Sequence, residues 1–293
     1  MLIGAQCDVF HTKAVYTNSV HKGRLQVGVF DSGFGGLTVL KALLEAVPDA
    51  DYLYFGDTAR LPYGSKSADT VARYACEAAR FLEQQGAGLL VIACNTATAL
   101  ALPQIRQAAS VEVLGVVEPG AQQAAAVSKT RRAVVIGTEA TVSSHAYRNA
   151  LAKFAIESNE KACPLLVPLV EEGWTGHSVT EEIARIYLAE AFADRFGAAD
   201  VLLLGCTHYP LLKPVLQKVV PKGVSLVDSA ESTAHAVAKL LNQQAERPDR
   251  APDPNDSPKI KFFVTDSAEK FQRLGKLFLG RPVTDITHVG LKE

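Results

Sequence analysis

Three observations predict an α/β fold of two pseudo-symmetric domains, each a mainly parallel sheet flanked by helices. From about Leu25, short runs rich in β-branched residues alternate with helical patterns, as they do when helices join parallel strands. Several of these runs are apolar almost throughout, as expected for strands that are covered on both faces. The second half of the chain then repeats the order of elements found in the first half.

The predicted elements follow one another along the chain. Residues 67–85 predict a helix that stops at Gly86, and residues 180–196 predict another that ends at Gly197. A further helix follows the glycine-rich turn in VGVFDSGFGGLTVLKALLEAVP. The predicted strands are LQVGVF (25–30), DYLYFG (51–56), GLLVIA (88–93), VEVLGVV (111–117), RAVVIG (132–137), LLVPLV (165–170), ADVLLLG (199–205), VSLVD (224–228) and IKFFVT (260–265).

Matching loops define the internal repeat and the predicted domains. In the first half, strands end at Asp31-Ser32-Gly33 and at Cys94-Asn95-Thr96; in the second half, they end at Gly137-Thr138 and at Cys206-Thr207-His208. Two similar units place such loops opposite each other. The predicted parts are an N-terminal extension (1–24), a first domain (25–115 plus 229–293) and a second domain (116–228), with a solvated proline-rich loop at 245–259.

Composition limits the possible partners. The 293 residues, 48% of them hydrophobic, suffice for two domains with cores of their own. Lys and Arg number 30 against 31 Asp and Glu, which argues against nucleic acid or an anionic membrane as partner. No stretch reaches the roughly 18 to 20 apolar residues of a membrane span, and the N-terminus lacks the pattern of a signal peptide. We therefore expect a cytoplasmic protein whose partner is a small molecule or a second copy of the chain.

The five cysteines are odd in number, widely spread and without a C-x-x-C pair. This distribution argues against a disulfide framework and against a structural zinc site, and it predicts reduced thiols.

The glycine-rich turn of VGVFDSGFGGLTVL is a candidate anion site. It lies between a strand and a helix, where backbone N–H groups and the helix dipole can hold a carboxylate or a small phosphate. It matches neither G-x-G-x-x-G nor a phosphate loop. A tight turn that merely closes a strand is the alternative, but Asp31 and Ser32 stand at the strand end where such sheets bind ligands.

LLVIACNTATA and VLLLGCTHYP each place a cysteine directly after an apolar strand, with polar side chains beside it. A packed thiol is the ordinary explanation for either cysteine alone. A metal site needs three or four converging ligands, whereas these motifs supply two cysteines and one histidine. A nucleophilic pair of Cys206 and His208 leaves Cys94 without a role, and redox pairs usually lie closer together in sequence.

Proton transfer at two faces of one carbon uses both thiols. Inverting a stereocentre by deprotonation needs a base on one face and an acid on the other, and facing loops of two similar units provide that placement. Neighbours and burial can bring a thiol pKa from about 8.5 toward working pH. Asp31 and His208 are the candidate neighbours.

Three further motifs offer polar groups, each with an ordinary structural explanation. Tyr63 and Gly64 in PYG belong to a loop whose backbone N–H groups can hold a carboxylate, although such a tripeptide is usually a turn. Thr138 and Thr141 in GTEATVSSHAY flank a helix start, where N-capping is the ordinary role. Glu171 in LVPLVEEGW is by default a solvated carboxylate.

Six motifs together carry a family resemblance that covers nearly the whole chain from about Gln26. In order they are VFDSGFGGLTVL, YFGDTARLPYG, VIACNTATA, IGTEATVSSHAY, VPLVEEG and LGCTHYPLL. This set resembles the glutamate racemases, cofactor-independent enzymes that interconvert L- and D-glutamate. The wider superfamily includes aspartate and hydantoin racemases, and GCTHYP looks like the glutamate branch. The resemblance implies two α/β domains with the active site in the cleft between them, the first domain being completed by the C-terminal segment.

The resemblance also implies residue roles. Cys94 and Cys206 match the two catalytic thiols, with Cys94 acting on D-glutamate and Cys206 on L-glutamate. Asp31 and His208 match the groups that assist these thiols, and Glu171 supports His208. The implied substrate contacts are Asp31, Ser32, Tyr63, Gly64, Asn95, Thr96, Thr138, Thr141, Thr207 and His208.

The remaining expectations concern cofactors, partners and cellular role. The resemblance implies no metal, no cofactor, a homodimer, and D-glutamate supplied to peptidoglycan synthesis. The extension at 1–24 and the proline-rich insertion have no counterpart among the core motifs. An amino-acid-binding or regulatory module with merely packed cysteines is the alternative from a different class. Two thiols at equivalent strand ends argue against it, since binding alone needs neither.

Overall fold

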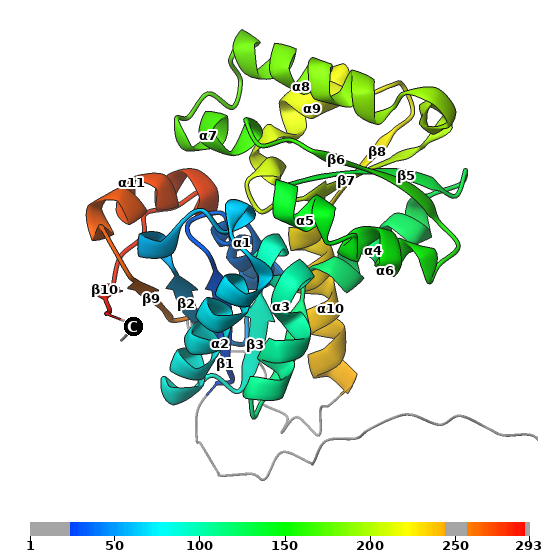
Figure 1. Cartoon of the computed structure of the whole chain (residues 1–293). Helices are drawn as coiled ribbons and strands as arrows, with labels where there is room; N and C mark the ends of the chain where they lie inside the picture. The colour runs from blue at the N-terminus through cyan, green and yellow to red at the C-terminus, as the bar shows by residue number, and fades with distance from the viewer. Residues whose placement is uncertain (1–23, 244–256, 291–293) are drawn as a thin grey trace, which may run out of the picture.

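The computed structural model describes residues 24–243 and 257–290, which form two lobes that each contain one sheet (Figure 1). Every strand pair in both sheets is parallel. The predicted α/β fold of two parallel sheets flanked by helices is therefore confirmed. Of the predicted extension only residue 24 is described, and most of the predicted loop at 245–259 also lies outside the described residues.

The first lobe is built on a six-stranded sheet ordered β10-β9-β2-β1-β3-β4. In the interior strand β1, Val27 and Val29 pack on one layer of helices and Phe30 packs on the other. This is the two-residue alternation of a strand that is covered on both faces. The strands are β1 (Gln26–Asp31), β2 (Asp51–Gly56), β3 (Leu89–Ile92), β4 (Glu112–Gly115), β9 (Ile260–Val264) and β10 (Ile286–His288).

The second lobe is built on a four-stranded sheet ordered β6-β5-β7-β8. Its interior strand β5 alternates in the same way, with Val134 and Ile136 on one side and Val135 on the other. The strands are β5 (Arg132–Gly137), β6 (Glu157–Ala162), β7 (Val201–Gly205) and β8 (Ser225–Asp228).

Helices cover both faces of each sheet. The six-stranded sheet carries α1 (Leu37–Ala46), α10 (Ser229–Gln243) and α11 (Ala268–Leu279) on one face, and α2 (Ala68–Gln84) and α3 (Asn95–Ala108) on the other. The four-stranded sheet carries α7 (Leu166–Glu171), α8 (Ser178–Ala191) and α9 (Lys213–Val219) on one face, and α4 (Val117–Val127) and α6 (Ala146–Ala152) on the other. Shorter helical segments in the connections are η1 (Thr58–Arg60), η2 (Tyr63–Ser65), α5 (Glu139–Ser143), η3 (Asp194–Ala198) and η4 (Tyr209–Leu212). No helix within the described ranges is long and apolar enough to cross a membrane.

Helix α10 connects the two lobes. It begins at Ser229, directly after the last strand of the second sheet, and packs on α1 of the first lobe. Figure 1 shows it running from the second lobe alongside the first. The division into domains at residues 115 and 228 stays a prediction; strands β4 and β8 end at those residues.

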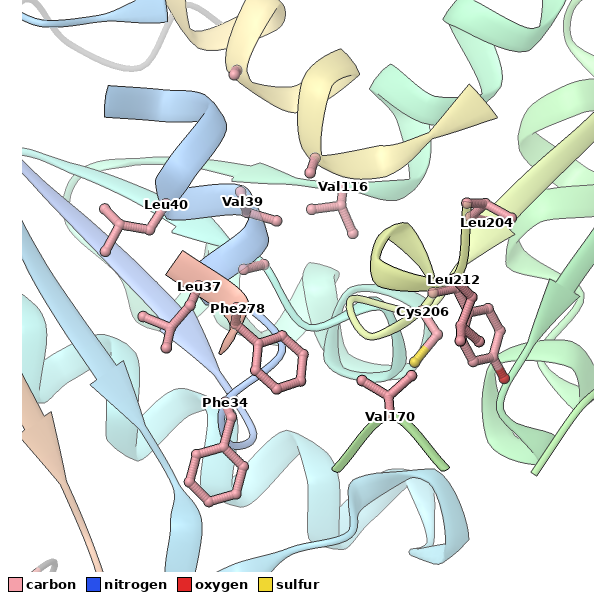
Figure 2. Packing of buried hydrophobic residues seen from close by; sticks show 14 of the residues in the cluster. Phe34, Leu37, Val39, Leu40, Val116, Val170, Leu204, Cys206, Leu212 and Phe278 are labelled. Atoms are coloured by element: carbon pink, nitrogen blue, oxygen red, sulfur yellow. The ribbon is translucent and has the colours of Figure 1, made fainter. Parts of the chain in front are cut away.

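One apolar cluster continues from the first lobe into the second. Figure 2 shows Leu37 and Phe278 of the first lobe together with Val170, Cys206 and Leu212 of the second, all members of this buried cluster. Close packing of this kind transmits small displacements and resists gaps. The two lobes are therefore joined by buried apolar packing as well as by the chain itself.

Eight of the nine predicted strands are confirmed, and DYLYFG and RAVVIG match β2 and β5 residue for residue. The predicted helix at 67–85 is confirmed as α2. The hydroxyl of Ser67 caps it by accepting a hydrogen bond from the N–H of Thr70. The helix is followed by Gly86 with a φ of 102°, a conformation that favours glycine.

The predicted strand LLVPLV is wrong, because residues Leu166–Glu171 form helix α7. Leu166 and Val170, four residues apart, are buried, whereas Leu165 is 52% exposed. That is the spacing of one helix face. A short apolar run fits a buried strand or a buried helix equally well, so the sequence pattern did not separate them.

Two strands were missed, and one helix is shorter than predicted. Strand β6 reads ESNEKA and is an edge strand paired only with β5, so it needs no apolar run. Strand β10 has three residues at the edge of the other sheet. The helix predicted at 180–196 is α8, which ends at Ala191; Asp194 has a φ of 51°, which a continuing α-helix does not accommodate.

Candidate active site

A cavity of about 450 Å³ lies between the loops that follow the strands of the two lobes. Its walls carry residues that follow β1, β2 and β3 of the first lobe and β5 and β7 of the second. Ligands of parallel sheets bind at such carboxyl ends. Of the predicted site residues, Asp31 and Thr141 do not line the cavity. Those that do are Ser32, Tyr63, Gly64, Cys94, Asn95, Thr96, Thr138, Glu171, Cys206, Thr207 and His208.

Cys94 stands at the N-terminus of α3. Its Sγ accepts a hydrogen bond from the N–H of Ala97 at 3.4 Å and donates one to the Oγ of Ser32 at 3.4 Å. Burial, assisted by the charge of Asp31, raises the pKa of Cys94 to about 12, so it rests as a thiol at neutral pH. The cysteines in the described residues are all free thiols: Cys76, Cys94, Cys163 and Cys206.

Asp31 is almost fully buried beneath the glycine-rich turn. Its Oδ2 accepts a hydrogen bond from the N–H of Gly33 at 2.8 Å, while its Oδ1 has no hydrogen-bond partner among the described residues. Burial raises the pKa of Asp31, and the charge of His208 and the backbone N–H groups of the turn act against that rise. The turn that the sequence marks as an anion site thus holds this carboxylate of the chain itself.

Cys206, His208 and Glu171 form a row of contacts in the second lobe. The Sγ of Cys206 lies 3.9 Å from Nδ1 of His208, and Nε2 of His208 lies 3.2 Å from Oε1 of Glu171. Burial lowers the pKa of His208, but its contacts with Cys206 and Glu171 outweigh burial and raise the pKa to about 10. Burial likewise opposes ionisation of Glu171, yet the bond to His208 lowers the pKa of that carboxyl. At neutral pH, His208 is therefore an imidazolium beside the sulfur of Cys206.

Three threonine hydroxyls meet across the two lobes. The Oγ1 of Thr96 lies 2.9 Å from that of Thr138 and 3.2 Å from that of Thr141. Thr138 also caps α5, because its Oγ1 accepts a hydrogen bond from the N–H of Thr141. Thr138 therefore both caps a helix and lines the cavity. Thr141 supports this hydroxyl cluster without lining the cavity.

The loops after β1 and β7 touch directly. The hydroxyl of Thr38 donates a hydrogen bond to the carbonyl of Thr207 at 3.1 Å. A Cβ atom added to Gly35 would lie 2.1 Å from the Oγ1 of Thr207 and 2.6 Å from Nδ1 of His208. Only glycine permits this approach, so the sequence of the turn sets how closely the two lobes meet beside Cys206.

Asn95 is held by two partners outside its own helix. The hydroxyl of Tyr147 in α6 donates to Oδ1 of Asn95 at 2.6 Å, and Nδ2 of Asn95 donates to the Oγ of Ser229 at 3.4 Å. All three side chains are buried. The amide of Asn95 is therefore fixed in one orientation at the cavity wall.

The pairing of two strand-end cysteines with this fold agrees with a known family. A family model described as Asp/Glu/Hydantoin racemase matches residues 27–237, from the first strand to α10. The chain belongs to this racemase family.

Similarity to individual racemases extends over most of the chain. A glutamate racemase of Koribacter versatilis is 60% identical over 282 residues, which cover 90% of this chain and 97% of that protein. The crystal structure of glutamate racemase from Thermus thermophilus in complex with β-chloro-D-alanine has a TM-score of 0.80 and 44% identity, covering 92% of this chain and 98% of that one. The glutamate racemase of Francisella tularensis in complex with D-glutamate has a TM-score of 0.82 and 34% identity, with 91% and 98% coverage. The resemblance drawn from the six motifs is confirmed, and the chain is an amino-acid racemase.

The cavity of the racemase also contains residues that the sequence pattern did not single out. Lys270 of α11 lines it, with its Nζ 3.9 Å from Oε2 of Glu171. Val167 and Pro168 of α7 line it as well, but their segment was predicted as a strand. Lys270 belongs to none of the six motifs, and only the tertiary fold brings it to the cavity. Tyr147, which orients Asn95, lies inside the motif IGTEATVSSHAY, and that motif was the sequence feature that could have indicated its role.

Proposed function

We propose that the racemase interconverts L- and D-glutamate by moving a proton between the two faces of the α-carbon. The observation that carries this proposal is that Cys94 and Cys206 line one cavity from different lobes. The glutamate racemases of Koribacter versatilis and Geobacter metallireducens, 60% and 48% identical, support glutamate as the substrate.

The proposed reaction uses one thiolate and one thiol. In the L-to-D direction, the thiolate of Cys206 removes the α-proton and the thiol of Cys94 delivers its proton to the opposite face. Turnover leaves Cys206 as a thiol and Cys94 as a thiolate, which is the form that acts on D-glutamate. The imidazolium of His208 stands beside the sulfur of Cys206, while burial raises the pKa of Cys94 and keeps it a thiol.

The carbanionic intermediate adds negative charge that the cavity has to stabilise. Preorganised donors do this best in a site without bulk water. We assign this task to backbone N–H groups at the helix starts and to the hydroxyls of the cavity wall. No step calls for a pyridoxal cofactor or a metal.

The substrate contacts divide into direct and supporting residues. Asp31 acts from behind the wall on the side of Cys94, Thr141 orients the hydroxyl of Thr138, and Glu171 supports His208. The direct contacts with glutamate are Ser32, Tyr63, Gly64, Asn95, Thr96, Thr138, Thr207 and His208.

The wider role follows from the product. D-glutamate supplied by this reaction feeds bacterial peptidoglycan synthesis in the cytoplasm. The two lobes act as two domains, 25–115 plus 229–293 and 116–228, that close on the substrate and exclude water. The working unit is a homodimer.

Racemisation in D2O tests the reaction. Purified protein without added cofactor is incubated with L-glutamate, and the product enantiomer is expected to carry solvent deuterium at the α-carbon. Cys94→Ala and Cys206→Ala are each expected to lower kcat by about 10³-fold or more, because each removes an essential acid or base. Racemisation at the normal rate in either variant overturns the two-thiol reaction.

Two further outcomes identify the competing functions. Preferential racemisation of aspartate selects a different substrate within the family. Stoichiometric glutamate binding without exchange of its α-proton selects a binding or regulatory module.

A further inference from the structure

Asp57 is a fully buried carboxylate in the motif GDTARLPYG that the proposed reaction does not use. It follows β2, and its backbone N–H donates a hydrogen bond to the carbonyl of Asp31 at 3.1 Å. A charged side chain this deep needs partners that balance its charge and fill its acceptor sites.

Three donors converge on this carboxylate. The hydroxyl of Tyr63 donates to Oδ2 at 2.5 Å, and Nε of Arg60 and the hydroxyl of Thr265 donate to Oδ1 at 3.1 and 2.9 Å. Arg60 supplies the balancing charge and is itself held by Glu77 of α2 at 2.7 Å. The orientation of the carboxylate is therefore set from three directions.

Tyr63 connects this buried group to the cavity. Residues 61–65 line the cavity, and the ring of Tyr63 is 1% exposed behind them. Gly64 lies so close to the second lobe that an added Cβ would stand 2.9 Å from Cβ of Thr138. A small rotation of Tyr63 thus displaces the backbone that faces Thr138.

We propose that Asp57 is a positioning residue, which anchors the hydroxyl of Tyr63 and thereby holds the backbone of residues 61–65 in place to bind the carboxylate of the substrate. This inference rests on the proposed function and adds a residue that makes no contact with the substrate itself. The carboxylate acts by accepting the phenolic hydrogen while Arg60 prevents it from turning away.

An aspartate serves here better than an asparagine. All three neighbours are donors, and a carboxylate offers acceptors on both oxygens, whereas an amide turns an NH2 group toward one of the donors. Hydrogen bonds to an ionised acceptor are also the stronger ones. Asp57→Asn keeps the size of the side chain and weakens the anchor.

A purely structural role is the competing explanation. The ion pairs of Asp57, Arg60 and Glu77 then stabilise only the first lobe, and Asp57→Asn lowers stability without changing substrate affinity. The positioning role acts through Tyr63, so Tyr63→Phe has to reproduce the effect. The two explanations therefore differ in KM and in how the two substitutions combine.

The experiment measures KM and kcat for both enantiomers in wild type, Asp57→Asn, Tyr63→Phe and the double variant. Each single variant is expected to raise KM by about tenfold, the effect of losing one charge-assisted hydrogen bond, with kcat changed less than about threefold. The double variant is expected to match the single variants, because both remove the same bond. A normal KM in folded Asp57→Asn, or effects that multiply in the double variant, overturns the inference.

Hydrogen exchange supplies a readout that does not depend on activity. The N–H of Lys66 donates to the carbonyl of Tyr63 at 3.0 Å, so its exchange reports on this segment. Faster exchange in residues 61–66 is expected in Asp57→Asn and Tyr63→Phe. Unchanged exchange in these residues overturns the inference. This readout holds whether or not glutamate is the substrate. Thr265→Val is the matched control. It removes a different bond to the same carboxylate, together with the bond that the N–H of Ala59 donates to the Thr265 hydroxyl, but it leaves the bond from Tyr63 in place. The exchange and KM are therefore expected to stay near wild type. Wild-type protein that fails to racemise glutamate contradicts the proposed function alone.

Discussion

Nδ1 of His208 lies 3.9 Å from the sulfur of Cys206, whereas the sulfur of Cys94 contacts the hydroxyl of Ser32 and the N–H of Ala97. The two thiols therefore stand in different electrostatic surroundings. The imidazolium of His208 lies beside the sulfur of Cys206, whereas burial beside the charge of Asp31 raises the pKa of Cys94. This asymmetry makes His208 the charged group to test on the side of Cys206.

His208→Asn tests the contribution of that cation. We expect kcat/KM to fall by about 10²-fold, the effect of losing a group that assists proton transfer. The loss of kcat/KM has to be equal in both directions. The two enantiomers have equal free energies in water, so the equilibrium constant fixes the ratio of the two kcat/KM values for every variant. Circular dichroism of the reaction mixture measures both directions.

Glu171→Gln is the control for this substitution. It retains a hydrogen-bond acceptor for Nε2 of His208 but removes the charge that raises the histidine pKa. A smaller loss than in His208→Asn is therefore expected. If His208→Asn racemises glutamate within twofold of the wild-type rate, His208 does not assist proton transfer by Cys206.

The pH dependence of stability tests the same histidine by a route that needs no substrate. The pKa of His208 rises from 6.5 to about 10 on folding, so the folded protein holds a proton that the unfolded chain has released. Its stabilising contribution is complete below pH 6.5 and is lost as pH rises toward 10. We expect wild type to lose at least about 1.4 kcal/mol more than His208→Asn across that range, one pKa unit being worth about that much.

Urea unfolding at several pH values between 6.5 and 10 measures this difference. Titrating groups that do not face His208 are common to both proteins, so the difference between the two curves reports on His208 together with the groups that it contacts. Parallel curves would show that the folded protein does not raise the pKa of this histidine.

The strand ends could be predicted from sequence because they follow a local rule. Apolar runs that stop at Asp31, Cys94 and Cys206 mark where parallel strands end, and the carboxyl ends of such strands face a common site. Helix α7 could not be separated from a strand, since its six residues are too few to reveal a period. Strand β6 is polar because it lies at a sheet edge, and edges do not require an apolar run.

The contacts that orient the site residues could not be read from local sequence. Asp57 and Thr265 are separated by more than two hundred residues, as the sequence numbers show, and only the pairing of β2 with β9 brings them together. Lys270 reaches the cavity from α11 by the same return of the chain. A sequence pattern within one segment does not show which distant residues will contact it. The roles of these residues could therefore be recognised only from the folded structure.

Gly35→Ala tests the contact between the lobes. Its methyl group would lie 2.1 Å from the Oγ1 of Thr207 and 2.6 Å from Nδ1 of His208, closer than atoms can approach. The loops have to separate, which moves His208 away from its productive position. We expect kcat/KM to fall by about 10²-fold, as displacements of about 1 Å do in active sites, while the protein stays folded.

Gly176→Ala is the matched control. An added Cβ at Gly176 meets no atom within 4 Å, so activity and the free energy of unfolding are expected to stay near wild type. Steady-state kinetics and urea unfolding on both variants separate the two sites. Full activity in Gly35→Ala would mean that the lobes do not need this close approach.

Tyr147→Phe tests whether the orientation of Asn95 matters for substrate binding. The substitution removes the hydroxyl that donates to Oδ1 of Asn95 at 2.6 Å and leaves this buried acceptor without that donor. A lost buried partner costs about 1 to 3 kcal/mol of stability. The freed amide then samples other orientations, so we expect KM for glutamate to rise several-fold, with kcat less affected.

Tyr52→Phe separates this effect from general destabilisation. Tyr52 is as buried as Tyr147, and its hydroxyl donates to the carbonyls of Leu43 and Val47, away from the cavity. Both variants are expected to lose stability in urea unfolding, because each removes a buried hydroxyl that donates a hydrogen bond. Only Tyr147→Phe is expected to change KM, because only it releases a side chain of the cavity wall. An equal rise of KM in both variants would assign the effect to loss of stability and not to Asn95.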